Sequence, residues 1–123
     1  MDIYDEIEKA ISAHGQWKVK LRRAIDTGVC ESTPDKVKQD NNCSFGKWLH
    51  YRLDEQYKDC EMYRDVVNLH ANFHREAGTI LELALNGERE QAQDLIKLGG
   101  RFSRYSGQLT RTMKQWQASL AQR

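Results

Sequence analysis

Four side chains with metal-binding chemistry stand at informative places in the sequence: His14, Cys43, His70 and His74. His70 and His74 are four residues apart, so on a helix their imidazoles would share one face. His14 has apolar neighbours at helical spacing and should point inward as well. A neutral imidazole in a core needs partners for its nitrogens, and three are hard to satisfy with side chains alone. A metal ion would satisfy all three.

Zinc favours four ligands from imidazole and thiolate in a tetrahedral arrangement. Cys43 is the natural fourth ligand, because Phe45 and Trp48 follow it and would hold its segment on the core. A thiolate near a helix start is also electrostatically favoured. The residues alone leave ordinary alternatives open: a hydrogen-bonded core histidine at position 14, an inert buried thiol at position 43, and an H-x-x-x-H pair that binds nothing.

The remaining histidine and cysteines are predicted to take no part in the site. His50 falls off the inner face of its segment and is expected to be solvated, Cys30 lies in a polar loop, and Cys60 is expected to pack in the core. Three cysteines at irregular spacing do not make a disulfide framework. In a reducing compartment such a thiol serves as a ligand, a redox centre or core filling.

The elements that must position these residues are predicted from apolar periodicity to be helices. A first helix spans 3–25 and ends before Gly28, followed by a polar surface loop over about 28–43. A short helix over 44–53 carries the cysteine ligand at its start. A third helix runs from Cys60 to the Asn86-Gly87 stop signal, and a fourth from Glu88 to Leu120, with close packing expected at its internal glycine pair.

Together these elements predict an all-α fold, an antiparallel four-helix bundle forming a single domain over 1–123. The chain has 19 basic and 18 acidic side chains, a balance that gives no sign of a nucleic-acid surface. No run approaches the roughly 20 apolar residues that a membrane span needs. Acidic residues at the N-terminus do not resemble a signal peptide, so we expect a cytoplasmic protein without membrane insertion.

Three segments of the chain resemble the chemoreceptor zinc-binding domain family of bacterial signalling proteins. They are Ala-His-Gly-Gln-Trp-Lys around His14, the run Cys43-Ser-Phe-Gly-Lys-Trp-Leu, and His70-Ala-Asn-Phe-His74. The resemblance implies that one zinc ion per chain is bound by His14, Cys43, His70 and His74. Gly46 would then allow a close approach of the short helix to a neighbour, and Trp48 would shield the thiolate, with Trp17 and Phe45 as further supporting residues.

The same resemblance implies a sensory role without catalysis. Domains of this family occur in chemoreceptors and diguanylate cyclases, are dimeric, and respond to zinc or to oxidants such as hypochlorous acid. We therefore expect a homodimer that acts in chemotaxis or cyclic di-GMP control through an attached or associated output. Cys43 would be the redox switch, because its sulfur is the one ligand that an oxidant converts to a sulfenate. Its release would mobilise the loop, expected to be the least tethered segment.

Three other functions are alternatives to this one. A hydrolytic zinc enzyme is disfavoured because Ala71, not glutamate, follows His70, and because four protein ligands leave no open position. A di-iron bundle needs Glu-x-x-His pairs, which the sequence lacks. A purely structural, zinc-stabilised dimerisation module is the strongest alternative.

Overall fold

The computed structural model describes residues 3–121, and every regular element in that range is a helix. The prediction of an all-helical chain is confirmed for this range. None of the described helices is long and apolar enough to cross a membrane. The elements are α1 (Ile3–Gly15), α2 (Trp17–Thr27), α3 (Pro34–Lys38), α4 (Ser44–Lys47), a π-helical turn (Trp48–Arg52), a 3-10 turn (Glu55–Tyr57), α5 (Glu61–Leu85), α6 (Arg89–Ile96) and α7 (Arg101–Ala121).

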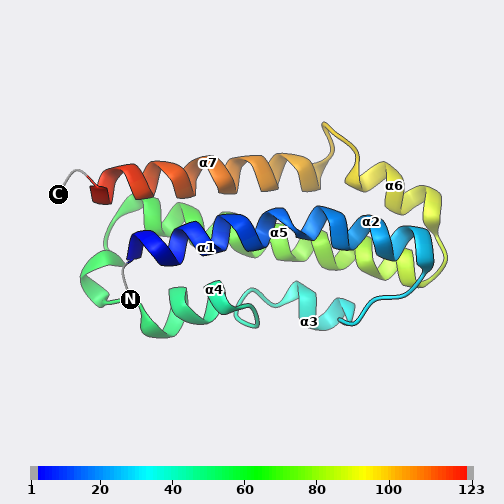
Figure 1. Cartoon of the computed structure of the whole chain (residues 1–123), viewed down its shortest axis with the longest axis horizontal. Coiled ribbons are helices and arrows are strands. Elements are labelled where there is room, and N and C mark those ends of the chain that lie inside the picture. The colour runs from blue at the N-terminus through cyan, green and yellow to red at the C-terminus, as the bar shows by residue number, and fades with distance from the viewer. Residues whose placement is uncertain (1–2, 122–123) are drawn as a thin grey trace.

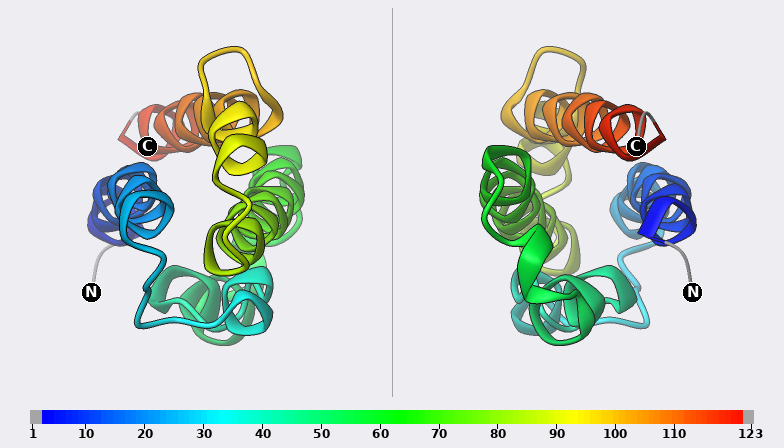
Figure 2. Two further views of the ribbon diagram at one scale, coloured as in Figure 1. Left: turned by 90° about the vertical axis from the view of Figure 1, so that its right-hand side faces the viewer. Right: turned by 90° about the vertical axis from the view of Figure 1, so that its left-hand side faces the viewer.

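The helices lie in four rows that reverse direction from one to the next (Figure 1). α1 and α2 form the first row, α3 and α4 the second, α5 the third and α7 the fourth, while α6 lies at one end between α5 and α7. The end-on views show the rows arranged around a common interior (Figure 2). Large side chains fill it, among them Leu49, Phe73, Leu81 and Trp116, each exposed by no more than 2%.

The first predicted helix is present but is divided at Gln16. The backbone N–H of Gln16 donates to the carbonyl of Ala13 at 3.2 Å, three residues back, so the helix tightens locally between α1 and α2. The backbone of Gln16 stays helical, and α2 continues the direction of α1 (Figure 1). Gly28 ends α2 in a left-handed conformation with φ of 75°, as expected for a C-terminal glycine. The first row therefore carries His14 at the last turn of α1.

The predicted surface loop over 28–43 is wrong in part, because it contains α3. Thr33 caps this helix, its hydroxyl accepting a hydrogen bond from the N–H of Lys36, and proline follows at the first helical position. α3 packs closely on α5: a side chain on Gly78 would overlap Lys38, and Lys38 also pairs with Glu82 at 3.1 Å. The segment is thus attached to α5 through α3. A helix of five residues is too short to show periodicity in the sequence.

The segment that carries the cysteine begins as predicted, with Cys43 as the residue that caps α4. The helix is α-helical only to Lys47 and continues as a wider π-helical turn to Arg52. Its apolar residues Phe45, Trp48 and Leu49 are buried, as expected from their spacing. The third helix also has the predicted extent, because α5 starts after Cys60 and ends at Leu85, directly before the Asn-Gly pair.

The fourth helix is not continuous, and this prediction is wrong. α6 ends at Ile96, and α7 starts at Arg101. Gly99 between them has φ of 87°, a left-handed conformation that a helix interior does not accept. A side chain on Gly99 would meet nothing within 4 Å, whereas one on Gly100 would meet the backbone carbonyl of Leu95 at 2.9 Å. The close packing expected at the glycine pair is therefore found at Gly100, against the end of α6, and not at Gly99.

Candidate metal centre

The four predicted side chains converge inside the molecule although they come from three separate segments. His14 comes from the end of α1, Cys43 from the turn before α4, and His70 and His74 from α5. Their nearest ligand atoms, three Nε2 nitrogens and one sulfur, all lie within 4.8 Å of one another. Among the described residues, this is the only group of three or more histidine, cysteine or acidic side chains that could hold a metal ion.

The ligand atoms of this cluster lie close together, at separations from 3.0 to 4.8 Å. His70 Nε2 lies 3.0 Å from His14 Nε2 and 3.0 Å from His74 Nε2. The sulfur of Cys43 lies 3.4 Å from His70 Nε2 and 4.0 Å from His14 Nε2. Neighbouring ligand atoms around tetrahedral zinc are about 3.3 to 3.6 Å apart, as its bond lengths require. The longest separation among the four atoms is 4.8 Å, so the side chains would have to close by about 1 Å along that edge to bind one ion together.

Backbone carbonyls orient two of the imidazoles. His14 Nδ1 lies 2.8 Å from the carbonyl of Ala10, and His74 Nδ1 lies 3.0 Å from the carbonyl of Val37. A carbonyl only accepts, so in each ring Nδ1 carries the proton and Nε2 offers a lone pair to the centre. Metal-bound histidines are held in this manner by a carbonyl or carboxylate on the second nitrogen.

The third imidazole, His70, shows why the cluster needs a cation. Its Nε2 faces the Nε2 lone pairs of both His14 and His74, and one proton on His70 could bond only one of them. Its Nδ1 is buried with no hydrogen-bond partner among the described residues. Buried polar atoms left in this state cost free energy. A positive ion at the centre satisfies all three Nε2 atoms together, so the residues fit zinc.

The turn that carries the sulfur is built around Gly46. The N–H of Gly46 donates to the sulfur of Cys43 at 3.2 Å, so the thiol caps the start of α4. A side chain on Gly46 would overlap the backbone carbonyl of Asp40. The close approach expected at Gly46 is therefore made to the turn before Cys43, within the same segment, and not to a neighbouring helix.

Burial sets the protonation of the cluster. It is the largest cause that lowers the pKa of His14 to about 4 and of His70 to about 2, with nearby histidines adding to the effect. Burial lowers the pKa of His74 as well and raises that of the Cys43 thiol. The imidazoles are thus neutral and ready to bind a metal near pH 7, whereas the thiol must release a proton when it becomes a ligand.

Aromatic rings surround the imidazoles. Phe45 meets His14 and His70 edge to face, with ring centroids 5.8 and 5.2 Å apart. Phe73 meets His14 and His74 edge to face at 5.2 and 5.5 Å. Trp48 stacks on Phe45 at 5.6 Å, behind the ring that contacts the ligands. Trp17 is half-buried and lies beside His14 and Cys43 at the surface of the cluster.

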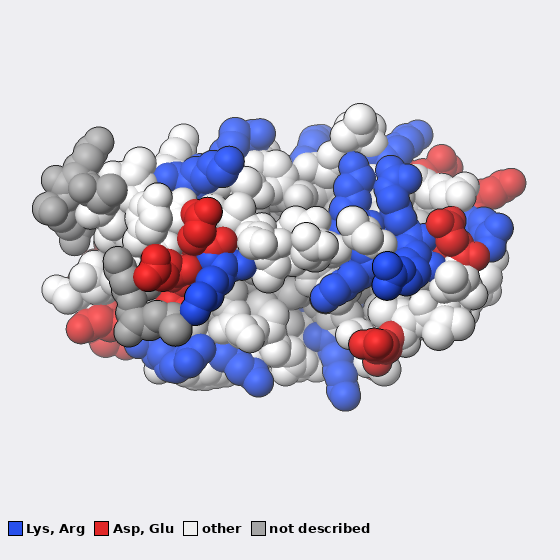
Figure 3. All heavy atoms as spheres, viewed as in Figure 1, with Lys and Arg blue, Asp and Glu red and all other residues white. Residues whose placement is uncertain are grey.

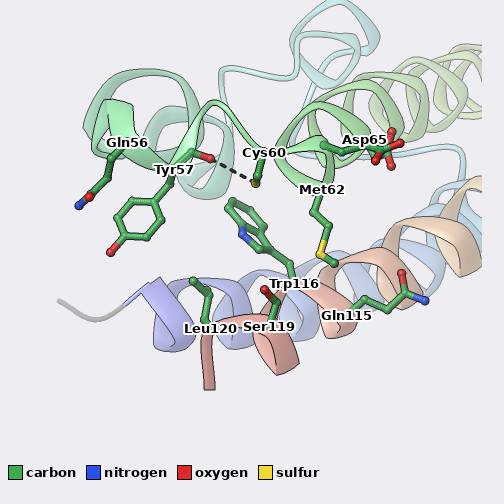
Figure 4. Close-up of a pocket in the computed structure, with 10 residues that line it drawn as sticks. Gln56, Tyr57, Cys60, Met62, Asp65, Gln115, Trp116, Ser119 and Leu120 are labelled. Carbon is green, nitrogen blue, oxygen red and sulfur yellow. Dashed lines mark hydrogen bonds between the residues drawn. The ribbon is translucent and has the colours of Figure 1, made fainter. Parts of the chain in front are cut away.

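The residues expected to stay outside the cluster do so, with two differences from expectation. His50 is not simply solvated: it is half-buried, and its Nε2 lies 3.0 Å from a carboxylate oxygen of Asp40. Cys60 is not core filling, because its sulfur caps α5 by accepting from the N–H of Tyr63. It lines a separate pocket of about 370 Å³ against Trp116 (Figure 4). Cys30 lies in the loop after α2.

One of three comparisons with known proteins gave a match, and it covers all four residues of the cluster. The family model of the chemoreceptor zinc-binding domain, abbreviated CZB, matches residues 14–81. The matched span begins at His14 and includes the other three residues of the cluster. Neither the comparison with curated proteins nor that with solved structures gave a match.

Proposed function

The chain belongs to the chemoreceptor zinc-binding domain family, and from that membership we propose that it is a zinc-binding sensory domain of bacterial signal transduction. One zinc ion per chain is bound by His14, Cys43, His70 and His74. The observation that carries this proposal is the convergence of three buried imidazole nitrogens and one half-buried sulfur within 4.8 Å of one another. The domain responds to zinc or to oxidants and controls chemotaxis or cyclic di-GMP synthesis.

The redox switch in this proposal is Cys43. Bound zinc holds a cysteine as its thiolate, the reactive form. The sulfur attacks the chlorine of hypochlorous acid, an S–Cl bond forms, and hydroxide leaves. Water then replaces chloride, giving the sulfenic acid, chloride and a proton. The sulfur loses two electrons, and the chlorine gains them. A sulfenic acid is a poorer ligand than a thiolate, whereas the imidazoles stay intact, so the site opens at Cys43.

The contacts around the cluster indicate how such opening would spread. Cys43 caps α4 through the N–H of Gly46, so a change at the sulfur alters the start of that helix. His74 bonds the carbonyl of Val37 in α3, so a change in the imidazoles reaches the other helix of the same row. We propose that the four rows form one antiparallel four-helix bundle. In this bundle both helices of the second row, α3 and α4, are coupled to the site.

The rest of the proposal concerns partners. We propose that the domain is cytoplasmic, forms a homodimer and acts on an attached or associated output, such as a chemoreceptor signalling domain or a diguanylate cyclase. It performs no catalysis itself, because four protein ligands leave no position on the metal for water or substrate. It binds neither nucleic acid nor membrane.

Zinc release by hypochlorous acid tests the redox function. Zinc-loaded wild type and a Cys43→His variant are titrated with the oxidant, and free zinc is followed with a coloured chelator. We expect faster release from wild type, because only the sulfur ligand is oxidised readily. Cys30→Ala and Cys60→Ala serve as controls that should release zinc as wild type does. Equal release from wild type and Cys43→His would contradict the redox switch.

A purely structural zinc site, which stabilises the fold without redox sensing, is the second candidate. The ligands join α1, the turn before α4 and α5, and a metal that links separate segments stabilises a fold directly. This candidate predicts that zinc removal lowers the unfolding temperature and that oxidant has no effect at doses that spare methionine and tryptophan. It is favoured if the oxidant experiment fails while zinc is still found at one ion per chain.

A further inference from the structure

Two hollows in the surface lead to the cysteine of the cluster. The first, of about 440 Å³, lies between α1, α2 and α4 and is lined by His14 and Cys43. The second, of about 370 Å³, lies on the side of α3 and is lined by Cys43 and His74. Trp17 lines both and separates them. Cys43 is itself half-buried, so a small reagent can reach it by either route.

The linings of the two routes have the same net formal charge, +1, but the first holds two lysines and the second holds one. The first hollow is lined by Lys9 and Lys20 with a single acidic residue, Glu6. The second has one lysine, Lys36, among uncharged polar residues. Lys20 is held in place, because its ammonium lies over the ring of Trp17 at 4.9 Å from the centroid. Its charge is thus fixed at the rim of the first hollow.

On the α2 side of the first hollow, further basic residues add to this charge. α2 carries four basic residues, Lys18, Lys20, Arg22 and Arg23, against one acidic residue. In the space-filling view lysine and arginine gather over the half of this face formed by α2 and α6, whereas acidic side chains are prominent near the start of α1 (Figure 3). A hollow with positive walls concentrates anions and speeds their arrival.

We propose that the hollow between α1, α2 and α4 is the route by which small anionic electrophiles reach Cys43, and that Lys20 sets this preference for negative charge. The inference rests on the proposed function, in which the sulfur of Cys43 is the group that reacts. It adds the class of reagent: small electrophiles that carry a negative charge react faster at Cys43 than neutral electrophiles of the same size and reactivity.

Iodoacetate and iodoacetamide separate charge from size. Both are attacked by a thiolate at the same carbon, where an S–C bond forms, the C–I bond breaks and iodide leaves, but only iodoacetate is an anion. The rate of each reaction at Cys43 is measured by mass spectrometry of the digested protein, with Cys30 and Cys60 as internal references. The quantity compared is the ratio of the iodoacetate rate to the iodoacetamide rate.

The variants are Lys20→Gln, Lys20→Arg, Lys36→Gln and Lys114→Gln, the last being an exposed lysine of α7 that lines neither hollow. We expect Lys20→Gln to lower the ratio at Cys43 about threefold at low salt, the size expected for one screened charge nearby. Lys20→Arg should keep the ratio, and Lys114→Gln should not change it. Salt near 0.5 M should remove most of the difference.

Each contrary result has a definite meaning. A ratio that is unchanged in Lys20→Gln, or that falls equally in Lys114→Gln, overturns the proposal. A larger fall in Lys36→Gln overturns it in favour of the second hollow. The proposed function fails separately: if Cys43 is not a zinc ligand, zinc will not protect it from iodoacetamide, whatever the effect of charge. Both reagents are therefore tested on zinc-loaded and on chelator-treated protein.

Discussion

His14 and His74 are each fixed by a carbonyl on the far side of the ring, and Cys43 is fixed by a backbone N–H. The four cluster residues could be singled out from the sequence, since H-x-x-x-H on an apolar face and a cysteine before an apolar turn both favour a metal site. The residues alone left a core histidine and an inert thiol open, and the family resemblance favoured the zinc site over them. The supporting contacts could not be predicted, because they are made by the carbonyls of Ala10 and Val37. Every residue has a carbonyl, so no side-chain pattern marks them.

Cys43→Ala is expected to weaken zinc retention far more than Cys30→Ala or Cys60→Ala. Loss of a partner that only orients a ligand costs about 10- to 100-fold in affinity, so loss of a ligand should cost about 100-fold or more. Competition with a chelator of known affinity measures this. If all three variants lose zinc equally, Cys43 has no special role.

The stability of the metal-free protein should depend on pH through its buried histidines. The pKa of His14 falls from an ordinary 6.5 to about 4 in the fold, so between these values the unfolded chain binds more protons than the folded one. The free energy of unfolding therefore decreases as pH falls from 6.5 towards 4, by up to about 1.4 kcal/mol per pH unit for each such histidine. Urea unfolding across this range measures the slope. His14→Gln should have a shallower slope than wild type.

At the level of the elements, long helices were predictable and short ones were not. α5 follows the predicted limits because its periodic pattern covers 25 residues and ends at a strong stop signal. α3 was missed because its five residues complete little more than one turn. The break before α7 was missed because the apolar spacing continues on both sides of it, whereas the backbone is extended at Lys97 and left-handed at Gly99.

Gly46→Ala is expected to disturb the cysteine turn. The added methyl group would overlap the carbonyl of Asp40, and overpacking of this kind costs about 1 to 3 kcal/mol. We expect a lower unfolding temperature and weaker zinc binding, measured by calorimetry and chelator competition. The matched control is Gly107→Ala in α7, where the nearest atom belongs to the flexible side chain of Arg111. That change should be neutral or stabilising, since alanine favours a helix. Equal effects of the two changes would contradict this account of the turn.

At the scale of the whole molecule, the cluster joins the second row to the first and the third. Removal of zinc should therefore increase backbone hydrogen exchange most in residues 33–53, which include α3 and α4, and least in the middle of α5 and α7. Hydrogen–deuterium exchange with mass spectrometry of zinc-loaded and chelator-treated protein measures this directly. A uniform increase in hydrogen exchange along the chain would indicate that zinc stabilises the fold as a whole, as expected for a purely structural zinc site.

The second row differs from the others in one respect: it consists of two short helices, α3 and α4, where its neighbours are long. One of these helices reaches the cluster through the carbonyl of Val37 and the other through Cys43. The molecule thus has one row of two short helices, both attached to the buried cluster, beside rows of longer helices. Opening of the cluster would change the surface formed by α3 and α4 and leave the longer helices in place. A protein bound to that surface would then lose or gain contacts.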